Sequence, residues 1–202
     1  MRGGWCCPPL SEAERRFADH VIRWHADGHG LYSNWRACPF GFEGVENLAL
    51  DGAFIIIANH ESWFDVWALA GCLPIDVRFA AKKNLARIPV FGRAWQACGH
   101  ISVDRANRAS AIKSMTQAGR QIREEGLHTV FFAEGTRSPD GALQAFKKSP
   151  FVIAIEGGVS IVPVGLVGSR RVMPKGSFRI LPGTITVRVG EPISVEGVKL
   201  AD

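Results

Sequence analysis

The chain has 202 residues, of which 47% are hydrophobic and 21% are charged. These proportions are those of an ordinary globular domain, and they exclude a disordered chain, a collagen-like chain and a coiled coil. A multi-spanning membrane protein is also excluded, because no stretch of about 18 apolar residues is free of charge. The net charge of +5 fits an anionic partner, although a solvated basic surface is the simpler explanation.

The five cysteines include no Cys-x-x-Cys pair, and the first ten residues lack the apolar core of a secretory signal. Neither a zinc ribbon nor a thioredoxin-like site is indicated. We therefore expect reduced cysteines, a cytoplasmic protein and no metal site.

The N-terminal part, residues 1–36, is expected to be a helical segment. Phe17, Val21 and Trp24 recur at helical spacing, which predicts an amphipathic helix over residues 12–27. Tryptophans in this segment suit a membrane interface, and they equally suit packing against the rest of the protein. The remaining residues, 37–202, form the second expected region.

From residue 53 onwards, short Val-, Ile- and Phe-rich runs alternate with helical patterns. This alternation predicts a single α/β domain with a mixed, mostly parallel sheet of about seven strands covered by helices. The closing strands, with no helix expected between them, are predicted to pair as a hairpin. The strands are expected at 53–58, 77–81, 100–103, 129–133, 161–167, 178–181 and 185–189, and the helices at 63–72, 108–125 and 150–157.

Polar residues follow the first of these strands. His60 is placed in a loop just before a helix, and Asp65 falls in the first helical turn, within reach of the imidazole. A carboxylate that fixes and stabilises a histidine is the arrangement that a general base needs. The pattern Ser62 to Asp65 is also a plain helix-capping box, and a loop histidine beside such a box explains the residues without catalysis.

A second polar cluster, Glu134-Gly135-Thr136-Arg137, follows the strand at 129–133. Glycine permits close approach of the backbone to a ligand, and the planar guanidinium of Arg137 suits a phosphate. Turn chemistry explains the Pro-Asp-Gly that comes after it, but not the Glu-Gly-Thr-Arg run itself. Lys82 and Arg105 also follow predicted strands, and either one taken alone is explained as a surface cation.

Together and in this order, these clusters resemble the motifs of the glycerolipid acyltransferase family, whose best-known members are the lysophosphatidic acid acyltransferases. Asn59, His60 and Asp65 match the first signature, and Gly92 through Asp104-Arg105 resembles the second. Residues 132–138 match the third, with Ala133 where the family usually has proline. Val162-Pro163-Val164 matches the fourth, and the weaker Gly-x-Glu-Asn pattern is present at 44–47.

The resemblance implies acyl transfer from a thioester, on acyl-CoA or acyl-carrier protein, to the hydroxyl of a lysophospholipid such as 1-acyl-glycerol 3-phosphate. It implies that His60 is the general base and Asp65 its partner, and that the acceptor alcohol replaces a protein nucleophile. Lys82, Arg105 and Arg137 would bind phosphate, Glu134 would orient the acceptor, and Gly135 and Thr136 would complete the substrate-binding loop.

The resemblance further implies no cofactor beyond the acyl donor. Members of the family often carry N-terminal membrane-spanning helices, whereas only the helix over residues 12–27 is predicted here, so we expect peripheral association with the inner face of a membrane. Other acceptors remain open, namely glycerol 3-phosphate, another lysolipid or an amino-acid lipid. A hydrolase would use the same pair, but no Gly-x-Ser-x-Gly motif is present. A non-catalytic lipid-binding module is the remaining alternative. Nucleic-acid binding is not expected, because the basic residues form no stripe with interleaved aromatics.

Overall fold

The structure is a computed structural model that describes residues 40–82, 91–103 and 108–199. The expected N-terminal helix over residues 12–27, and the whole segment 1–36, lie outside the described residues. The elements, in chain order, are β1 (Phe40–Glu43), η2 (Val45–Leu48), β2 (Phe54–Ala58), α2 (Phe64–Cys72), β3 (Val77–Lys82), α3 (Phe91–Ala97), β4 (Ile101–Val103), α4 (Arg108–Glu124), β5 (His128–Phe132), α5 (Ser149–Gly157), β6 (Ser160–Val167), α6 (Ser169–Val172) and β7 (Ile185–Val189).

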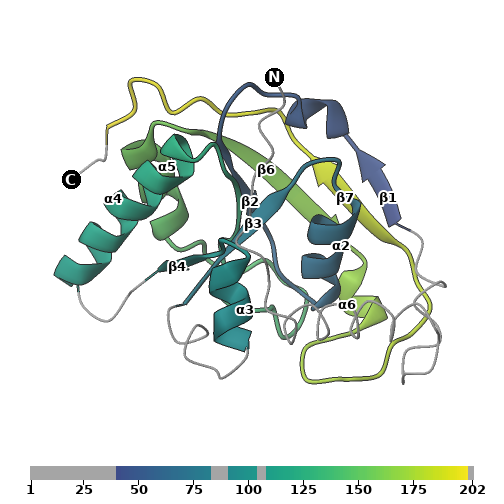
Figure 1. Ribbon diagram of the computed structural model, residues 1–202. Helices are drawn as coiled ribbons and strands as arrows, with labels where there is room; N and C mark the ends of the chain where they lie inside the picture. The colour runs from purple at the N-terminus through teal and green to yellow at the C-terminus, as the bar shows by residue number, and fades with distance from the viewer. Residues whose placement is uncertain (1–39, 83–90, 104–107, 200–202) are drawn as a thin grey trace.

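Within the described residues, the strands form one seven-stranded sheet in the order β1-β7-β6-β2-β5-β3-β4 (Figure 1). Strands β6, β2, β5, β3 and β4 are mutually parallel. Strand β7 runs antiparallel to β6 and parallel to β1. The expectation of a mixed, mostly parallel sheet is therefore confirmed.

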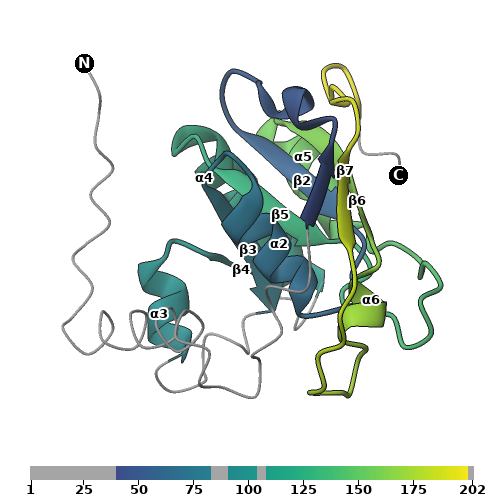
Figure 2. The same cartoon turned by 90° about the vertical axis from the view of Figure 1, so that its right-hand side faces the viewer.

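Helices cover both faces of this sheet (Figure 2). Strand β2 is buried along its whole length, as expected for a central parallel strand that faces a core on each side. Phe54 and Ile56 belong to the core on the α2 face, whereas Ile55 and Ile57 belong to the core under α4 and α5. Successive side chains of β2 therefore pack into the two cores on opposite faces of the sheet.

Helices α4 and α5 approach each other closely at two glycines. A Cβ atom added to Gly119 would lie 2.7 Å from the backbone oxygen of Ile153, and one added to Gly157 would lie 2.7 Å from the oxygen of Gly119. Real Cβ atoms do not tolerate such distances to backbone atoms. Glycine at both positions is therefore what lets the two helices share one face of the sheet.

The end of the chain differs from the sequence-based expectation. Residues 178–181 are not a strand, and Phe178 is 81% exposed. The closing hairpin is wrong too, because β7 pairs with β6 and β1, and α6 lies between β6 and β7. The expected elements also omitted β1 and α3, which are short and lack a clear hydrophobic period.

The carboxyl ends of the parallel strands meet at one edge of the sheet. Ala58, the last residue of β2, pairs with Phe132 of β5 on one side and with Val164 of β6 on the other. The loops that follow β2 and β5 are therefore neighbours, and α/β proteins build ligand sites at such an edge. No helix in the described part of the chain is long and apolar enough to cross a bilayer.

Candidate active site

The site begins where β2 ends, at Asn59. Its side chain pairs with the backbone of Leu166 in β6 through two hydrogen bonds, accepting from the N–H at 2.7 Å and donating to the oxygen at 2.9 Å. The asparagine amide thus continues the sheet pairing for one more residue. This contact fixes the direction in which the chain leaves the sheet towards His60.

Both backbone groups of His60 are bound by the loop that follows β5. The His60 N–H donates to Oε1 of Glu134 at 2.8 Å, and the His60 oxygen accepts from the Ser138 N–H at 2.7 Å. The register of β2 against β5 explains the first contact, because His60 and Glu134 each lie two residues beyond the paired Ala58 and Phe132. The two sequence clusters are therefore one structural unit.

The imidazole of His60 is held on two further sides. Its Nδ1 lies 2.9 Å from Oδ2 of Asp65, and its ring stacks on Phe132 with centroids 3.8 Å apart and planes 15° from parallel. The side chain is 14% exposed, and no described residue hydrogen-bonds its Nε2. A bond from Nδ1–H to the carboxylate would leave Nε2 with the free lone pair that a general base requires.

Asp65 is fully buried and its Oδ2 accepts three contacts. Besides Nδ1 of His60, it accepts the N–H of Glu61 at 2.7 Å and that of Ser62 at 2.8 Å. The Ser62 hydroxyl accepts in return from the N–H of Phe64, near the start of α2. The capping box and the histidine–aspartate pair are thus both present, and the cap itself presents the carboxylate to the imidazole.

Glu61 stands next to His60 in a concentration of acidic groups. Burial raises the pKa of its carboxyl, and the nearby carboxylates of Asp65 and Glu134 raise it further. The charge and the backbone N–H of Arg170 act in the opposite direction. The described residues nevertheless contain no group of three or more side chains placed to bind a metal ion.

Glu134 is 2% exposed, and both of its carboxylate oxygens accept backbone hydrogen bonds. Oε1 accepts from His60, and Oε2 accepts from the N–H of Gln144 at 3.0 Å. The sequence predicted that Glu134 orients the acceptor, and that role stays a prediction. The geometry places the carboxylate between two loops, where it fixes the backbone that carries the imidazole.

The rest of the second cluster is partly or fully exposed. Gly135 has a φ of 73°, the left-handed conformation that favours glycine, and it turns the chain just after Glu134. Thr136 is exposed, and the guanidinium carbon of Arg137 lies 5.0 Å from the ring centroid of Trp63. This cation–π contact holds the Arg137 guanidinium over Trp63, which lies just before α2 in the loop that carries His60.

For Lys82 and Arg105, the other two residues predicted to bind phosphate, the structure gives less information. Lys82 is the last residue of β3 and pairs with Val103 of β4, so its backbone lies at the same sheet edge as His60. Arg105 lies outside the described residues. Their assignment to phosphate binding therefore remains a prediction from the sequence.

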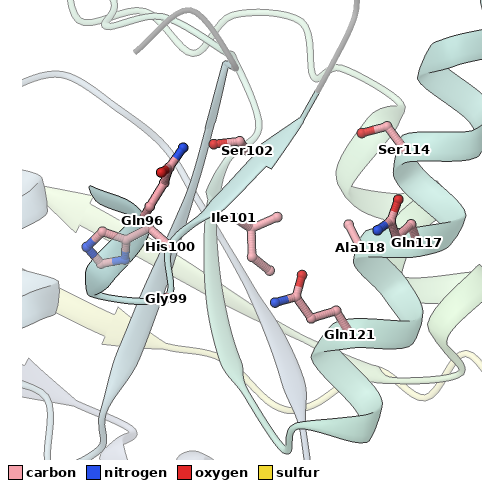
Figure 3. Close-up of a pocket in the computed structure, with 9 residues that line it drawn as sticks. All are labelled: Gln96, Gly99, His100, Ile101, Ser102, Ser114, Gln117, Ala118 and Gln121. Carbon is pink, nitrogen blue, oxygen red and sulfur yellow. The ribbon is translucent and has the colours of Figure 1, made fainter. Parts of the chain in front are cut away.

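A cleft of about 310 Å³ lies elsewhere, between β4 and α4 (Figure 3). Gln117 and Gln121 from α4 line it together with Ile101 and Ser102 of β4. Figure 3 shows the ring of His100 turned away from this space, and its Nδ1 lies 3.1 Å from the donating N–H of Phe79. None of the residues of the His60 site lines the cleft.

The sequence placed Phe132 and Ser138 in the third motif but did not predict their contacts with His60. Phe132 forms the floor under the imidazole, and the Ser138 backbone holds the His60 carbonyl. Both residues stand within a few positions of Glu134, but their contacts depend on the register of β2 against β5. Ser62 was expected only as a cap, and its hydroxyl also donates to the oxygen of Met173 at 2.8 Å.

The fold and the site define an α/β protein with a hydrogen-bonded histidine–aspartate pair, the geometry that a general base requires, at the carboxyl edge of a mostly parallel sheet. Ser62, the nearest hydroxyl side chain in this loop, is buried and bonded on both sides, so it is no nucleophile. The model of the Acyltransferase family matches residues 40–167, and the chain belongs to that family.

Relatives with assigned names agree with this membership. A 1-acyl-sn-glycerol-3-phosphate acyltransferase of Limnanthes alba is 39% identical over 142 residues, which are 70% of this chain and 50% of the relative. The chloroplastic enzyme of the same name from Arabidopsis thaliana is 35% identical over 168 residues, 81% of this chain and 47% of the relative. The chain thus spans about half the length of these curated relatives.

A solved structure has the same fold. The 1-acyl-sn-glycerophosphate acyltransferase of Thermotoga maritima superposes with a TM-score of 0.67 at 25% identity, covering 96% of this chain and 75% of that one. The α/β architecture expected from the sequence is therefore confirmed.

Proposed function

We propose that the protein transfers a fatty acyl group from an acyl thioester to the free hydroxyl of 1-acyl-glycerol 3-phosphate in phospholipid synthesis. The observation that carries this proposal is the setting of His60. Its N–H, its carbonyl, its Nδ1 and one ring face are all engaged by described residues, which leaves Nε2 for the acceptor hydroxyl. The names of the family relatives supply the choice of acceptor.

The chemistry follows from this placement. Nε2 of His60 takes the proton of the acceptor hydroxyl as that oxygen attacks the thioester carbonyl. Asp65 stabilises the imidazolium through Nδ1. The tetrahedral intermediate then collapses, the C–S bond breaks, and the thiolate leaves with the electron pair and takes the proton from the imidazolium. Because a thiol has a pKa of about 8.5, its thiolate is a good leaving group, and the reaction requires no further cofactor or metal.

The acceptor lipid brings the enzyme to a membrane surface as a peripheral protein on the cytoplasmic side. Supporting this, Trp63 and Trp67 at the start of α2 are 46% and 40% exposed, next to the site. Tryptophan is favoured at membrane interfaces, where its ring is partly wet and partly apolar. Flotation of the full chain with vesicles of phosphatidylcholine, with and without anionic lipid, tests this placement.

The decisive experiment measures thiol release from a long-chain acyl-CoA, with and without 1-acyl-glycerol 3-phosphate. Wild type is compared with His60→Ala, and the measurement is repeated with acyl-carrier protein as donor. The proposal is supported if thiol release requires the acceptor, is accompanied by formation of diacylglycerol 3-phosphate, and is lost in His60→Ala. Retention of near-native turnover by His60→Ala contradicts the general-base assignment.

The other outcomes select the alternatives. Release without acceptor indicates a thioesterase. Release with glycerol 3-phosphate, another lysolipid or an amino-acid lipid keeps the chemistry and changes the acceptor. Absence of release with either donor and every acceptor, from a folded protein that binds vesicles, indicates a lipid-binding module.

A further inference from the structure

The segment after α6 forms a tight turn, Pro174–Ser177. The Ser177 N–H donates to the Pro174 oxygen at 3.1 Å, and Gly176 has a φ of 86°. A positive φ at the third position is the signature of a type II turn, in which glycine replaces bulkier residues at no steric cost. Lys175 stands at the second position of this turn and is exposed.

One hydrogen bond joins the residue just before this turn to the site, and a second closes the segment that contains the turn. The Met173 oxygen accepts from the buried hydroxyl of Ser62, at the start of α2, and the Leu181 N–H donates to the Val172 oxygen at 2.9 Å. Ser62 also donates its backbone N–H to the carboxylate of Asp65. The turn is thus joined directly to the residues that hold the imidazole, although more than a hundred positions of sequence separate them.

The ammonium of Lys175 reaches the loop that carries Arg137. Its Nζ donates to the Arg137 oxygen at 2.9 Å and lies 3.4 Å from Oγ1 of Thr136. An ammonium has three donors, so one remains for a ligand. No carboxylate among the described residues lies within 4.0 Å of the Lys175 ammonium or the Arg137 guanidinium. Two cations without an acidic partner among the described residues therefore lie together near His60, Arg137 on the loop after β5 and Lys175 on the turn after α6.

We propose that Lys175 is a substrate-binding residue and that, with Arg137, it binds the phosphate of the acceptor. This inference rests on the proposed function, because it names the cation pair that would recognise the acceptor's charged end. A phosphate monoester carries nearly two negative charges at neutral pH, and two cations match it. The cation–π contact with Trp63 holds the guanidinium, and the bonds to residues 136 and 137 hold the ammonium, so both charges are placed before the lipid binds.

The test compares Lys175→Met with Lys175→Arg, which keeps the charge. Lys113→Met is the matched control, because Lys113 is an exposed lysine on α4 and its loss changes the net charge equally. Calorimetry measures binding of short-chain 1-acyl-glycerol 3-phosphate and of the uncharged monoacylglycerol to the full chain. Steady-state kinetics with the same two acceptors measure KM and kcat.

We expect Lys175→Met to raise Kd and KM for the phosphorylated acceptor about tenfold, as loss of a charge-assisted hydrogen bond does, with kcat changed little. Binding of the uncharged acceptor should not change, Lys175→Arg should restore most of the affinity, and Lys113→Met should behave as wild type. Unchanged Kd and KM in Lys175→Met overturn the inference and leave the proposed function standing.

The two proposals fail separately. Binding of the phosphorylated acceptor that depends on Lys175, without any turnover, supports the phosphate site and contradicts the acyl transfer. Equal weakening of both acceptors would show that the turn only shapes the site, which overturns the inference. A wild type that binds neither acceptor and turns over neither contradicts both proposals.

Discussion

The backbone N–H of His60 lies 2.8 Å from the carboxylate of Glu134, a residue 74 positions further along the chain. The other oxygen of that carboxylate accepts the N–H of Gln144. A buried carboxylate with both oxygens on backbone donors makes strong, charge-assisted bonds. Glu134 therefore connects three segments, namely the end of β2, the end of β5 and the loop before α5.

Glu134→Gln tests this connection. The amide can accept only one of the two backbone bonds, and its NH2 group must face the other N–H. An unsatisfied buried donor costs about 1–3 kcal/mol, so we expect a lower melting temperature. If the carboxylate only positions His60, kcat falls while KM for the acceptor stays close to wild type. A raised KM with kcat preserved would instead favour direct orientation of the acceptor by Glu134.

Asp65→Asn tests the partner of the imidazole. The variant keeps the shape of the side chain but removes the negative charge that would stabilise an imidazolium. Its amide NH2 can also favour the wrong tautomer of His60. We expect kcat to fall by roughly 10²–10⁴, the range typical of general-base catalysis, with circular dichroism like that of wild type. Thiol release at near-native rate by a folded Asp65→Asn would contradict the pair's catalytic role.

Gly119→Ala tests the crossing of α4 and α5. The new methyl group would overlap backbone atoms of Ile153 and Gly157, which cannot move without shifting the helix. We expect a loss of about 1–3 kcal/mol in the free energy of unfolding by urea. The matched control is Gly71→Ala in α2, where an added Cβ meets nothing within 4 Å and better helix propensity should give up to about 1 kcal/mol. Equal effects of the two substitutions would show that the close approach is not limiting.

His100 makes folding stability depend on pH. Burial, together with the nearby charge of Arg78, lowers its pKa from 6.5 to about 4. Between these values the unfolded chain binds a proton that the folded chain excludes, because Nδ1 accepts the Phe79 N–H. Stability should therefore fall as the pH drops from about 6.5 to 4, and this contribution should change no further below that pH.

The measurement is the melting temperature of wild type and His100→Gln across this range. The variant cannot take up the proton, so its melting temperature should fall less steeply on acidification. Burial also lowers the pKa of His128, against the raising effect of Asp76, so His128→Gln should flatten the curve in the same direction. Parallel curves for wild type and His100→Gln would contradict this assignment.

The sequence predicted the elements whose patterns are strong. The buried run Phe54–Ala58 and the helical period of residues 108–125 are confirmed, within a few residues at their ends, as β2 and α4. Residues 178–181 have the apolar character of a strand but do not join the sheet, since β7 already lies between β6 and β1. Strand pairing depends on neighbours that are distant in sequence, so a local pattern cannot decide it.

Spacing and residue type alone revealed the histidine with an aspartate five positions on, the Glu-Gly-Thr-Arg run after a strand, and the order of these clusters. What those residues contact depends on how the strands pair in the folded protein. The register of Ala58 against Phe132 brings Glu134 to the His60 N–H, and the bond from Ser62 to Met173 ties the turn of Lys175 to the site. Hydrogen bonds to backbone groups leave no trace in side-chain spacing, because every residue except proline offers the same N–H and C=O.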